Sequence, residues 1–288
     1  MDIIEQARAR GLLFDGAFGS LLMQRGLPSG VNAELWCLEH PAIVSQIHAD
    51  YLAAGADVIT TNTFGASPLK LKKAGLARQA EEINRQMVAC AKAVITPESF
   101  VAGDIGPTGE MLKPYGLVSF EEVVANYAEQ ADYLVHSGVN LFIIETMFDL
   151  NEALAAIKGI QQVSKKPIFA TLTFEKKATG FATVMGNKVP EAMQSLIDAG
   201  AAAVGANCSI GSDKMVALAG EIRQAVESLV IVQPNAGLPV MHDGILHYPE
   251  DAATFAANIR KIKTLGVEIV GGCCGTTPEY VQLIRRII

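Results

Sequence analysis

Aromatic residues are scarce in this sequence. Phenylalanine, tryptophan and tyrosine together make up 6% of it, although half of the residues are hydrophobic. The apolar content therefore depends on alanine, valine, isoleucine and leucine. A chain of 288 residues with this composition can bury a sizeable core. Small and β-branched residues favour helices packed on parallel strands that are buried on both faces.

The sequence also lacks a long apolar run and a basic run. No stretch approaches the roughly 18 apolar residues of a membrane span, and the first residues, MDIIEQARARG, lack the apolar centre of a signal peptide. The net charge is -7, and basic residues are not interleaved with aromatic ones as they are in nucleic-acid-binding surfaces. We therefore expect a cytoplasmic protein that binds neither a membrane nor nucleic acid.

The number of cysteines is odd, which argues against a framework of disulfides. The five are Cys37, Cys90, Cys208, Cys273 and Cys274. Reduced thiols, available for metal binding or chemistry, are the better interpretation. We expect Cys37 and Cys90 to be structural, because both fall in helical or loop segments.

One pattern recurs along the chain: a helix ends at glycine or a small residue, and an apolar, β-branched run follows. Examples are LAAGADVITTNTF at 52–64, VHSGVNLFIIET at 135–146 and TLGVEIVGGCC at 264–274. Glycine suits the left-handed cap of a helix, and the run suits a strand buried on both faces. The pattern predicts eight strands, near residues 12–16, 57–64, 100–106, 141–146, 167–174, 203–209, 229–235 and 267–274.

Helical patterns fill the gaps between these strands. In the segment 41–55, for example, Ile43, Ile47 and Tyr51 follow one another at intervals of four residues, which places them on one face of a helix. Eight strand–helix units in a chain of this length match a (β/α)8 TIM barrel, an α/β fold, as a single domain over residues 1–288. An open, doubly wound α/β sheet is the competing fold.

Polar residues follow the carboxyl ends of the predicted strands. They are Asp15, Asn62, Thr63, Asp104, Glu145, Thr146, Asn207, Cys208, Gln233, Asn235, Cys273 and Cys274. In a (β/α)8 barrel all of these positions meet on one rim, where the active sites of such enzymes lie. Each residue alone could be a hydrogen-bonded structural residue, but the clustering predicts a functional site.

Three of these residues are cysteines: Cys208 after the sixth strand, and Cys273 and Cys274 after the eighth. Neighbouring strand residues point to opposite faces, so Cys273 and Cys274 can face one metal only if the backbone bends. The flanking Gly271 and Gly272 supply that freedom. Three thiolates that leave one position open are typical of a catalytic zinc site, and sulfur favours zinc over magnesium or calcium. Two other interpretations stay open: buried cysteines acting as small hydrophobic residues, and a disulfide between neighbours.

At these residues the sequence resembles the family of homocysteine-binding, zinc-dependent S-methyltransferases. The matching segments are LLFDGAFGSLL at 12–22, HADYLAAGADVITTNTFGAS at 48–67, GDIGPTGE at 103–110, FIIETMFD at 142–149, GANCSIG at 205–211, QPNAGLP at 233–239 and GGCCGTTPEYV at 271–281. They follow in order over nearly the whole chain. TNTFGAS and DIGPTGE are most similar to the homocysteine module of cobalamin-dependent methionine synthase.

The resemblance implies a zinc ion held by Cys208, Cys273 and Cys274. It also implies that homocysteine is the substrate and that its thiol receives a methyl group, giving methionine. Zinc would favour the thiolate of the substrate, which attacks a methyl carbon far better than the thiol does. The family's substrate-binding residues correspond here to Asp15, Ala17, Phe18, Thr63, Glu145 and Asn235.

Two of these assignments have a physical reason of their own. Glu145 is the natural counter-charge for the ammonium of the substrate. The loop at 15–19 precedes a helix and can turn backbone N–H groups toward the carboxylate. The plain alternatives are an ion pair for Glu145 and a simple strand-to-helix turn for the loop.

The sequence leaves the methyl donor open. Similarity to the methionine synthase module favours methylcobalamin, a methylated corrinoid, carried by a partner protein that docks over the rim. S-Methylmethionine or S-adenosylmethionine, which are small sulfoniums, and betaine are alternatives that need no partner. A zinc- or thiol-binding module without turnover is a hypothesis of another class. A phosphate-binding barrel is a third, although NAGLP and CCGTT after strands seven and eight do not form a clear phosphate loop.

Overall fold

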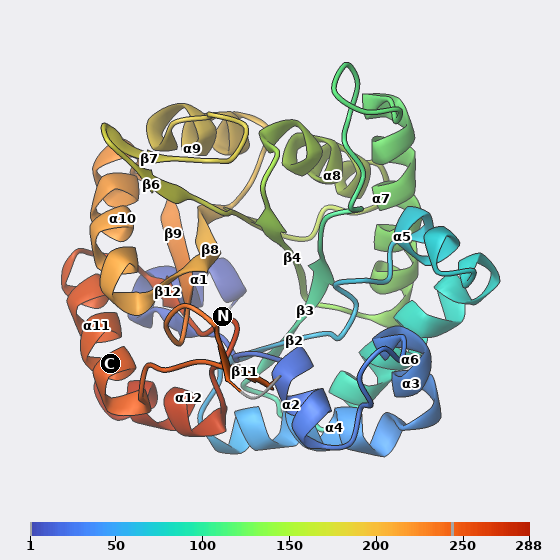
Figure 1. Cartoon of the computed structure of the whole chain (residues 1–288), viewed down its shortest axis with the longest axis horizontal. Coiled ribbons are helices and arrows are strands. Elements are labelled where there is room, and N and C mark those ends of the chain that lie inside the picture. The colour runs from blue at the N-terminus through green and yellow to red at the C-terminus, as the bar shows by residue number, and fades with distance from the viewer. Residues whose placement is uncertain (1, 243–244) are drawn as a thin grey trace.

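Eight parallel strands form a sheet that closes on itself in the computed structural model, which describes residues 2–242 and 245–288 (Figure 1). The strands are β1 (Leu12–Leu13), β2 (Val58–Thr60), β3 (Phe100–Ile105), β4 (Leu141–Met147), β5 (Ile168–Leu172), β8 (Ala203–Gly211), β9 (Leu229–Asn235) and β12 (Ile269–Val270). Their order around the ring follows the chain, and β1 pairs with β12. A parallel bridge between Phe14 and Val58 joins β1 to β2. The predicted (β/α)8 TIM barrel is confirmed.

Helices surround the barrel (Figure 1). Those that follow the eight strands are α4 (Pro41–Ala53), α6 (Ala80–Lys92), α7 (Phe120–Ser137), α8 (Leu150–Val163), α9 (Val189–Asp198), α10 (Ser212–Ala225), α11 (Ala252–Thr264) and α12 (Pro278–Arg285). Shorter additions are α1 (Ile3–Arg10), α2 (Gly19–Gln24), α3 (Ala33–Glu39), α5 (Pro68–Lys73) and a 3-10 turn at Ala77–Gln79. Within the described ranges, none of these helices combines the length and the apolar character needed to cross a membrane.

The interior of the barrel is apolar toward the amino ends of the strands and polar toward their carboxyl ends. Every second residue of a strand points inward. The inward residues form one buried cluster of Leu12, Phe14, Val58, Ala102, Leu141, Ile143, Phe169, Ala203, Leu229, Ile231 and Ile269. Ile3 and Ala7 of α1 join this cluster, so α1 closes the amino-terminal end of the barrel. Further along the same inward rows stand Thr60, Asp104, Glu145, Thr171, Asn207 and Gln233.

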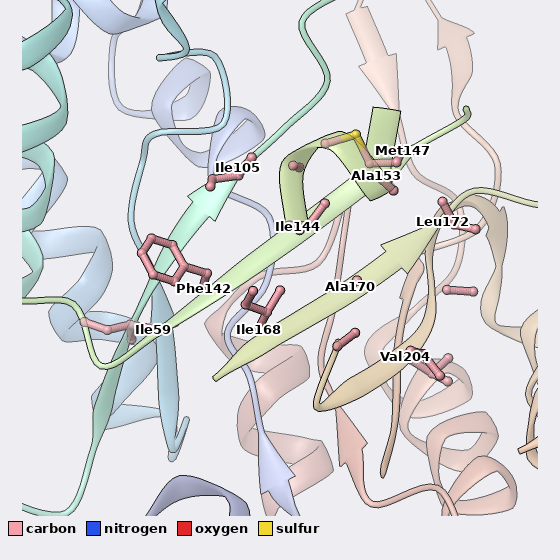
Figure 2. Packing of buried hydrophobic residues seen from close by; sticks show 14 of the residues in the cluster. Ile59, Ile105, Phe142, Ile144, Met147, Ala153, Ile168, Ala170, Leu172 and Val204 are labelled. Carbon is pink, nitrogen blue, oxygen red and sulfur yellow. The ribbon is translucent and has the colours of Figure 1, made fainter. Parts of the chain in front are cut away.

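The outward residues of the strands pack against the helices. Figure 2 shows this layer around β4 and β5, with Phe142 and Ile144 on one strand and Ala170 on the next. Ala153 of α8 lies in the same fully buried layer. Because both faces of the sheet are covered, the strands read as nearly continuous apolar runs, which made them visible in the sequence.

Several strands end earlier than predicted, β1 at Leu13 instead of 16 and β5 at Leu172 instead of 174 among them, and two hairpins were not predicted. β2 ends at Thr60 because the chain turns, with the N–H of Thr63 donating to the carbonyl of Thr61 (2.8 Å). β12 ends at Val270, before the predicted end at 274. The hairpins, both antiparallel, are β6 (Glu175–Lys177) with β7 (Gly180–Ala182), and β10 (Val240–His242) with β11 (Ile245–His247).

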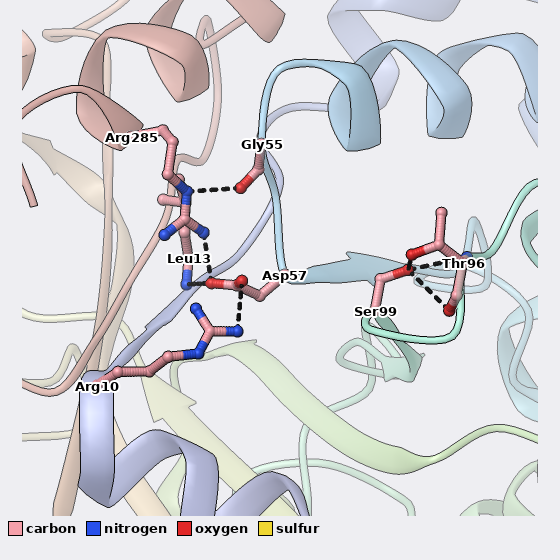
Figure 3. A network of polar contacts seen from close by, with 7 residues as sticks. All are labelled: Arg10, Leu13, Gly55, Asp57, Thr96, Ser99 and Arg285. Atoms are coloured by element: carbon pink, nitrogen blue, oxygen red, sulfur yellow. Dashed lines mark hydrogen bonds and ion pairs between the residues drawn. The ribbon is translucent and has the colours of Figure 1, made fainter.

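Asp57 joins the first and last parts of the chain near the amino-terminal end of the barrel (Figure 3). One carboxylate oxygen accepts hydrogen bonds from the N–H of Leu13 (2.8 Å) and the guanidinium of Arg285 (2.5 Å). The other oxygen accepts from Arg10 (3.0 Å). Arg285 also donates to the carbonyl of Gly55 (2.9 Å). A single carboxylate therefore connects α1, β1 and α12.

Replacing Asp57 with alanine is expected to lower the free energy of unfolding by about 2 kcal/mol. The buried N–H of Leu13 loses its acceptor, whereas the ion pair with the half-exposed Arg10 contributes little. Thermal denaturation measures the effect as a melting temperature lower by about 4–6 °C. Asp57→Asn keeps an acceptor for the N–H of Leu13, so its melting temperature should lie between those of the wild type and Asp57→Ala. A melting temperature equal to that of the wild type in Asp57→Ala would contradict this role.

Candidate functional site

Three cysteine sulfurs meet at the carboxyl-terminal rim of the barrel. The Sγ atoms of Cys208, Cys273 and Cys274 all lie within 4.8 Å of one another, and those of Cys208 and Cys274 are 3.9 Å apart. A tetrahedral zinc ion with Zn–S bonds of about 2.3 Å requires sulfurs about 3.8 Å apart. The three thiols are unbridged and partly exposed. Their spacing therefore fits three ligands of one zinc ion.

The bend that brings Cys273 and Cys274 to the same side is present after β12. The N–H of Cys273 donates to the carbonyl of Pro234 (2.8 Å), so the segment is anchored on β9. The N–H and the hydroxyl of Thr276 both donate to the carbonyl of Cys273 (3.1 and 2.7 Å), which closes a turn. A Cβ atom at Gly272 would lie 2.3 Å from the hydroxyl oxygen of Thr276, so the turn requires glycine there.

Asn207 organises the other side of the cluster. It is fully buried, and its Oδ1 accepts from the N–H of Thr146 and the hydroxyl of Thr171 (both 2.8 Å). Its amide group donates to the hydroxyl of Thr146 (2.8 Å). Thr146 and Cys208 have φ values of 59° and 57°, a left-handed conformation that is rare outside glycine. Asn207 thus holds the backbone beside both Cys208 and Glu145.

A cavity of about 420 Å³ extends from the cysteines across the rim. Carboxylates are prominent in its wall: Asp15, Glu34, Asp104 and Glu145. Among the described residues that line it there is no lysine, arginine or histidine. Such a cavity suits a ligand that carries positive charge, and it offers no cationic side chain to a phosphate group.

Glu145 and Asp15 lie in an environment that disfavours ionisation. Burial, followed by the charges of Cys208 and Asp15, raises the pKa of Glu145 to about 8. Burial also raises the pKa of Asp15 to about 7, although the N–H and hydroxyl of Thr60 donate to its carboxylate (2.7 and 2.8 Å). A cation bound in the cavity would lower both pKa values. None of the ion pairs found among the described residues involves Glu145.

The loop at 15–19 lines the cavity, as do Ala17 and Phe18 within it. The N–H of Ala17 donates to the hydroxyl of Thr276 (3.1 Å), and its carbonyl accepts from Tyr51 (2.6 Å). The ring of Phe18 packs against His48, with centroids 4.9 Å apart. Contacts from α4 and from the cysteine loop therefore fix the shape of this segment where α2 begins.

Thr63 and Asn235 lie behind the cavity rather than in its wall. The hydroxyl of Thr63 contacts that of Thr61 and donates to the carbonyl of Asp104 (both 2.7 Å). The Oδ1 atom of Asn235 accepts the N–H of Cys274 (3.1 Å). Both residues are buried and hold the backbone of residues that do line the cavity.

The sequence analysis gave no role to Tyr248, which lines the cavity next to the cysteines. Its hydroxyl lies close enough to the sulfur of Cys274 for each group to shift the pKa of the other. Tyr248 follows the unpredicted β10–β11 hairpin, so no pattern in the sequence pointed to it. Cys37 and Cys90, by contrast, are buried on α3 and α6 and lie outside the cluster of three sulfurs.

A family comparison and a comparison with solved structures both match this chain to homocysteine methyltransferases. Residues 12–288 match the family described as homocysteine S-methyltransferase. The metallated form of the homocysteine methyltransferase MmuM from Escherichia coli is 22% identical, with 99% of each chain covered and a TM-score of 0.81. The oxidized form of MmuM is 23% identical over 96% of this chain and 95% of that one, with a TM-score of 0.78. A methyltransferase from Methanosarcina mazei is 10% identical over 97% and 93% of the two chains, with a TM-score of 0.61. At these identities the solved structures establish a shared fold.

Proposed function

The chain belongs to the homocysteine S-methyltransferase family, and on that premise we propose that it transfers a methyl group to the thiol of homocysteine, giving methionine. The observation that carries this proposal is the convergence of three sulfurs at one end of an acidic cavity. A thiol acceptor needs a soft metal site, and an amino-acid acceptor needs a counter-charge for its ammonium. The lining of the cavity contains both the three cysteines and the carboxylate of Glu145.

Cys208, Cys273 and Cys274 would hold a zinc ion that keeps one position open for the substrate sulfur and favours its thiolate form. Glu145 would accept hydrogen bonds from the ammonium, and the loop at 15–19 would direct N–H groups to the carboxylate. The substrate sulfur forms a bond to the methyl carbon while the bond between that carbon and the donor breaks. The thiol proton is released to solvent, so no side chain is needed as a general base.

A methylated corrinoid on a partner protein is our first choice of donor. The similarity of TNTFGAS and DIGPTGE to the methionine synthase module supports it. So does the surface: most large exposed hydrophobic side chains lie on connections that follow strands at the rim. They are Met23, Val31, Leu35, Met111, Tyr115, Leu117, Val184, Leu238, Val240 and Met241. Exposed apolar side chains gathered around a site are typical of a surface that meets another molecule.

A small sulfonium donor, S-methylmethionine or S-adenosylmethionine, is the second candidate. The observation in its favour is the charge of the cavity, whose described lining carries four carboxylates and no cationic side chain. A positively charged sulfonium would be attracted there without a partner protein.

An activity assay separates these possibilities. Zinc-loaded protein is incubated with homocysteine and, in turn, methylcobalamin, S-methylmethionine, S-adenosylmethionine and betaine, and methionine is counted per chain. We expect many turnovers with the true donor. Less than one equivalent of methionine per chain with every donor would contradict the enzyme and favour a binding module without turnover.

Replacing Glu145 with alanine is expected to raise the KM for homocysteine about tenfold, because the ammonium loses its charged acceptor. The effect on kcat should be smaller, since the cysteines rather than Glu145 position the sulfur. Steady-state kinetics with varied homocysteine measures both constants. Glu175→Ala, on the exposed β6 strand, is the matched control and should retain the wild-type KM. A wild-type KM in Glu145→Ala would overturn the role of Glu145.

A further inference from the structure

We infer that Asp104 forms the second half of the ammonium site beside Glu145, and that this carboxylate pair restricts the enzyme to thiols that carry an α-amino group. The inference rests on the proposed function and names a specificity-determining residue for it. Asp104 was noted from sequence only as a polar residue at the end of a strand.

The backbone places the two acids on the same wall. β3 and β4 are neighbouring parallel strands, and Asp104 is in register with Ile143. Ile143 belongs to the inward apolar cluster, so Glu145, two residues further along, points inward on the same row. Ala102, also in that cluster, precedes Asp104 by two residues on its own inward row. With strands about 4.8 Å apart and a rise of about 3.3 Å per residue, the Cα atoms of Asp104 and Glu145 are about 8 Å apart.

One carboxylate oxygen of Asp104, Oδ1, lacks a partner in the described part of the chain. Its backbone is well bonded: the N–H donates to the hydroxyl of Thr61 (3.0 Å), and the carbonyl accepts from Thr63 (2.7 Å). The side chain is different, because Oδ1 is buried without a hydrogen bond and the residue is only 4% exposed. Buried polar atoms are nearly always paired, so an orphaned carboxylate oxygen in a cavity wall indicates a missing ligand group.

Another buried acid shows the contrast. Glu152 of α8 is fully buried, and its Oε1 accepts from the N–H and hydroxyl of Thr108 (2.7 and 2.6 Å) and from Tyr127 (2.9 Å). The other oxygen of Glu152, Oε2, is buried without a partner, but Glu152 does not line the cavity, whereas Asp104 does. The unpartnered oxygen of Asp104 therefore belongs to a residue that a ligand in the cavity can reach.

The charge of the missing group follows from the surroundings. Burial, followed by the charges of Glu145 and Asp15, raises the pKa of Asp104 well above its usual value. The positive charge of Lys70 acts in the opposite direction and lowers the pKa of Asp104. The ammonium of Lys70 lies over the ring of Phe64, 4.6 Å from its centre. A ligand cation inside the cavity would lower the pKa values of Asp104 and Glu145 and stabilise both carboxylates in their charged form. An alkylammonium has three N–H donors and can therefore address two carboxylates at once.

Binding measurements test the inference without a methyl donor. Isothermal titration calorimetry on the zinc-loaded protein compares homocysteine with 4-mercaptobutanoate, a thiol acid of the same length that lacks the amino group. Asp104→Asn is close to isosteric and removes only the charge. We expect it to weaken homocysteine binding at least tenfold and to change 4-mercaptobutanoate binding less than twofold. Asp149→Asn is the matched control, because asparagine can replace aspartate as the N-cap of α8, and it should leave both affinities unchanged.

Two results would overturn the inference. Wild-type affinity for homocysteine in Asp104→Asn would show that the residue does not bind the ammonium. An equal loss for both thiols would show that it acts on the structure of the site and not on the amino group. Failure of the wild-type protein itself to bind homocysteine when zinc is present would instead count against the proposed function.

Discussion

Cys208→Ser is expected to reduce methyl transfer by about a thousandfold or more and to lower the zinc content well below one ion per chain. The structure gives the reason, because the sulfur of Cys208 lies 3.9 Å from that of Cys274 and completes the group of three. Serine keeps the size and the backbone, but its hydroxyl is not ionised at neutral pH and is a poor ligand for zinc. Metal analysis under reducing conditions and the methionine assay measure the two effects.

Cys90→Ser provides the matched control for this prediction. Cys90 is a buried thiol on α6, and it lies outside the cluster of three sulfurs. The control should keep both its zinc and its activity, and circular dichroism should show that both variants fold. If Cys208→Ser kept its zinc and its turnover, Cys208 would have to be removed from the set of ligands.

Asn207→Ala is expected to lower kcat/KM about 100-fold and the free energy of unfolding by about 3 kcal/mol. The substitution leaves the partly buried N–H of Thr146 without its acceptor and removes the hydrogen bond from Thr171. Thr146 then loses the two contacts that hold its left-handed backbone next to Glu145, and the sulfur of Cys273 loses its contact with the amide group of Asn207 (3.8 Å). We therefore expect weaker zinc binding and a higher KM for homocysteine in the same variant.

Thr171→Val separates the two consequences of losing Asn207. It removes one of the hydrogen bonds to Asn207 but leaves those with Thr146 in place. Stability should fall by about 1 kcal/mol, with kcat/KM changed by less than about threefold. Chemical denaturation and steady-state kinetics, measured at a temperature where all variants are folded, give both values. A folded Asn207→Ala protein with wild-type kcat/KM would contradict the positioning role of Asn207.

The eight barrel strands could be predicted because each is buried on both faces. Their apolar runs, such as FVAGDI at β3 and LFIIETM at β4, stand out between the helical patterns that flank them. The β6–β7 hairpin could not be predicted in this way. The three residues of β6 are exposed, and Glu175, Lys176 and Lys177 carry no alternation of apolar and polar positions.

The candidate site was predicted in part. The cysteines and Glu145 stand at strand ends, and the structure brings them together around one cavity. The early end of β12 explains how adjacent cysteines reach the same side, because Cys273 and Cys274 lie in a turn where the alternation of a strand no longer applies. That these residues bind zinc and substrate stays a prediction.

The sequence by itself determined the barrel and the type of chemistry. Its inward rows change from apolar to polar at the carboxyl ends of the strands, and three sulfur donors stand at that boundary. Only the tertiary structure decided which polar groups are free to meet a ligand. The Oδ1 atom of Asn235 accepts the N–H of Cys274, whereas the Oδ1 atom of Asp104 remains without a partner in the described chain. A polar group can bind a ligand only with the donors and acceptors that the chain itself leaves unused. Such partners come from segments far apart in sequence, so folding alone brings them near or keeps them away.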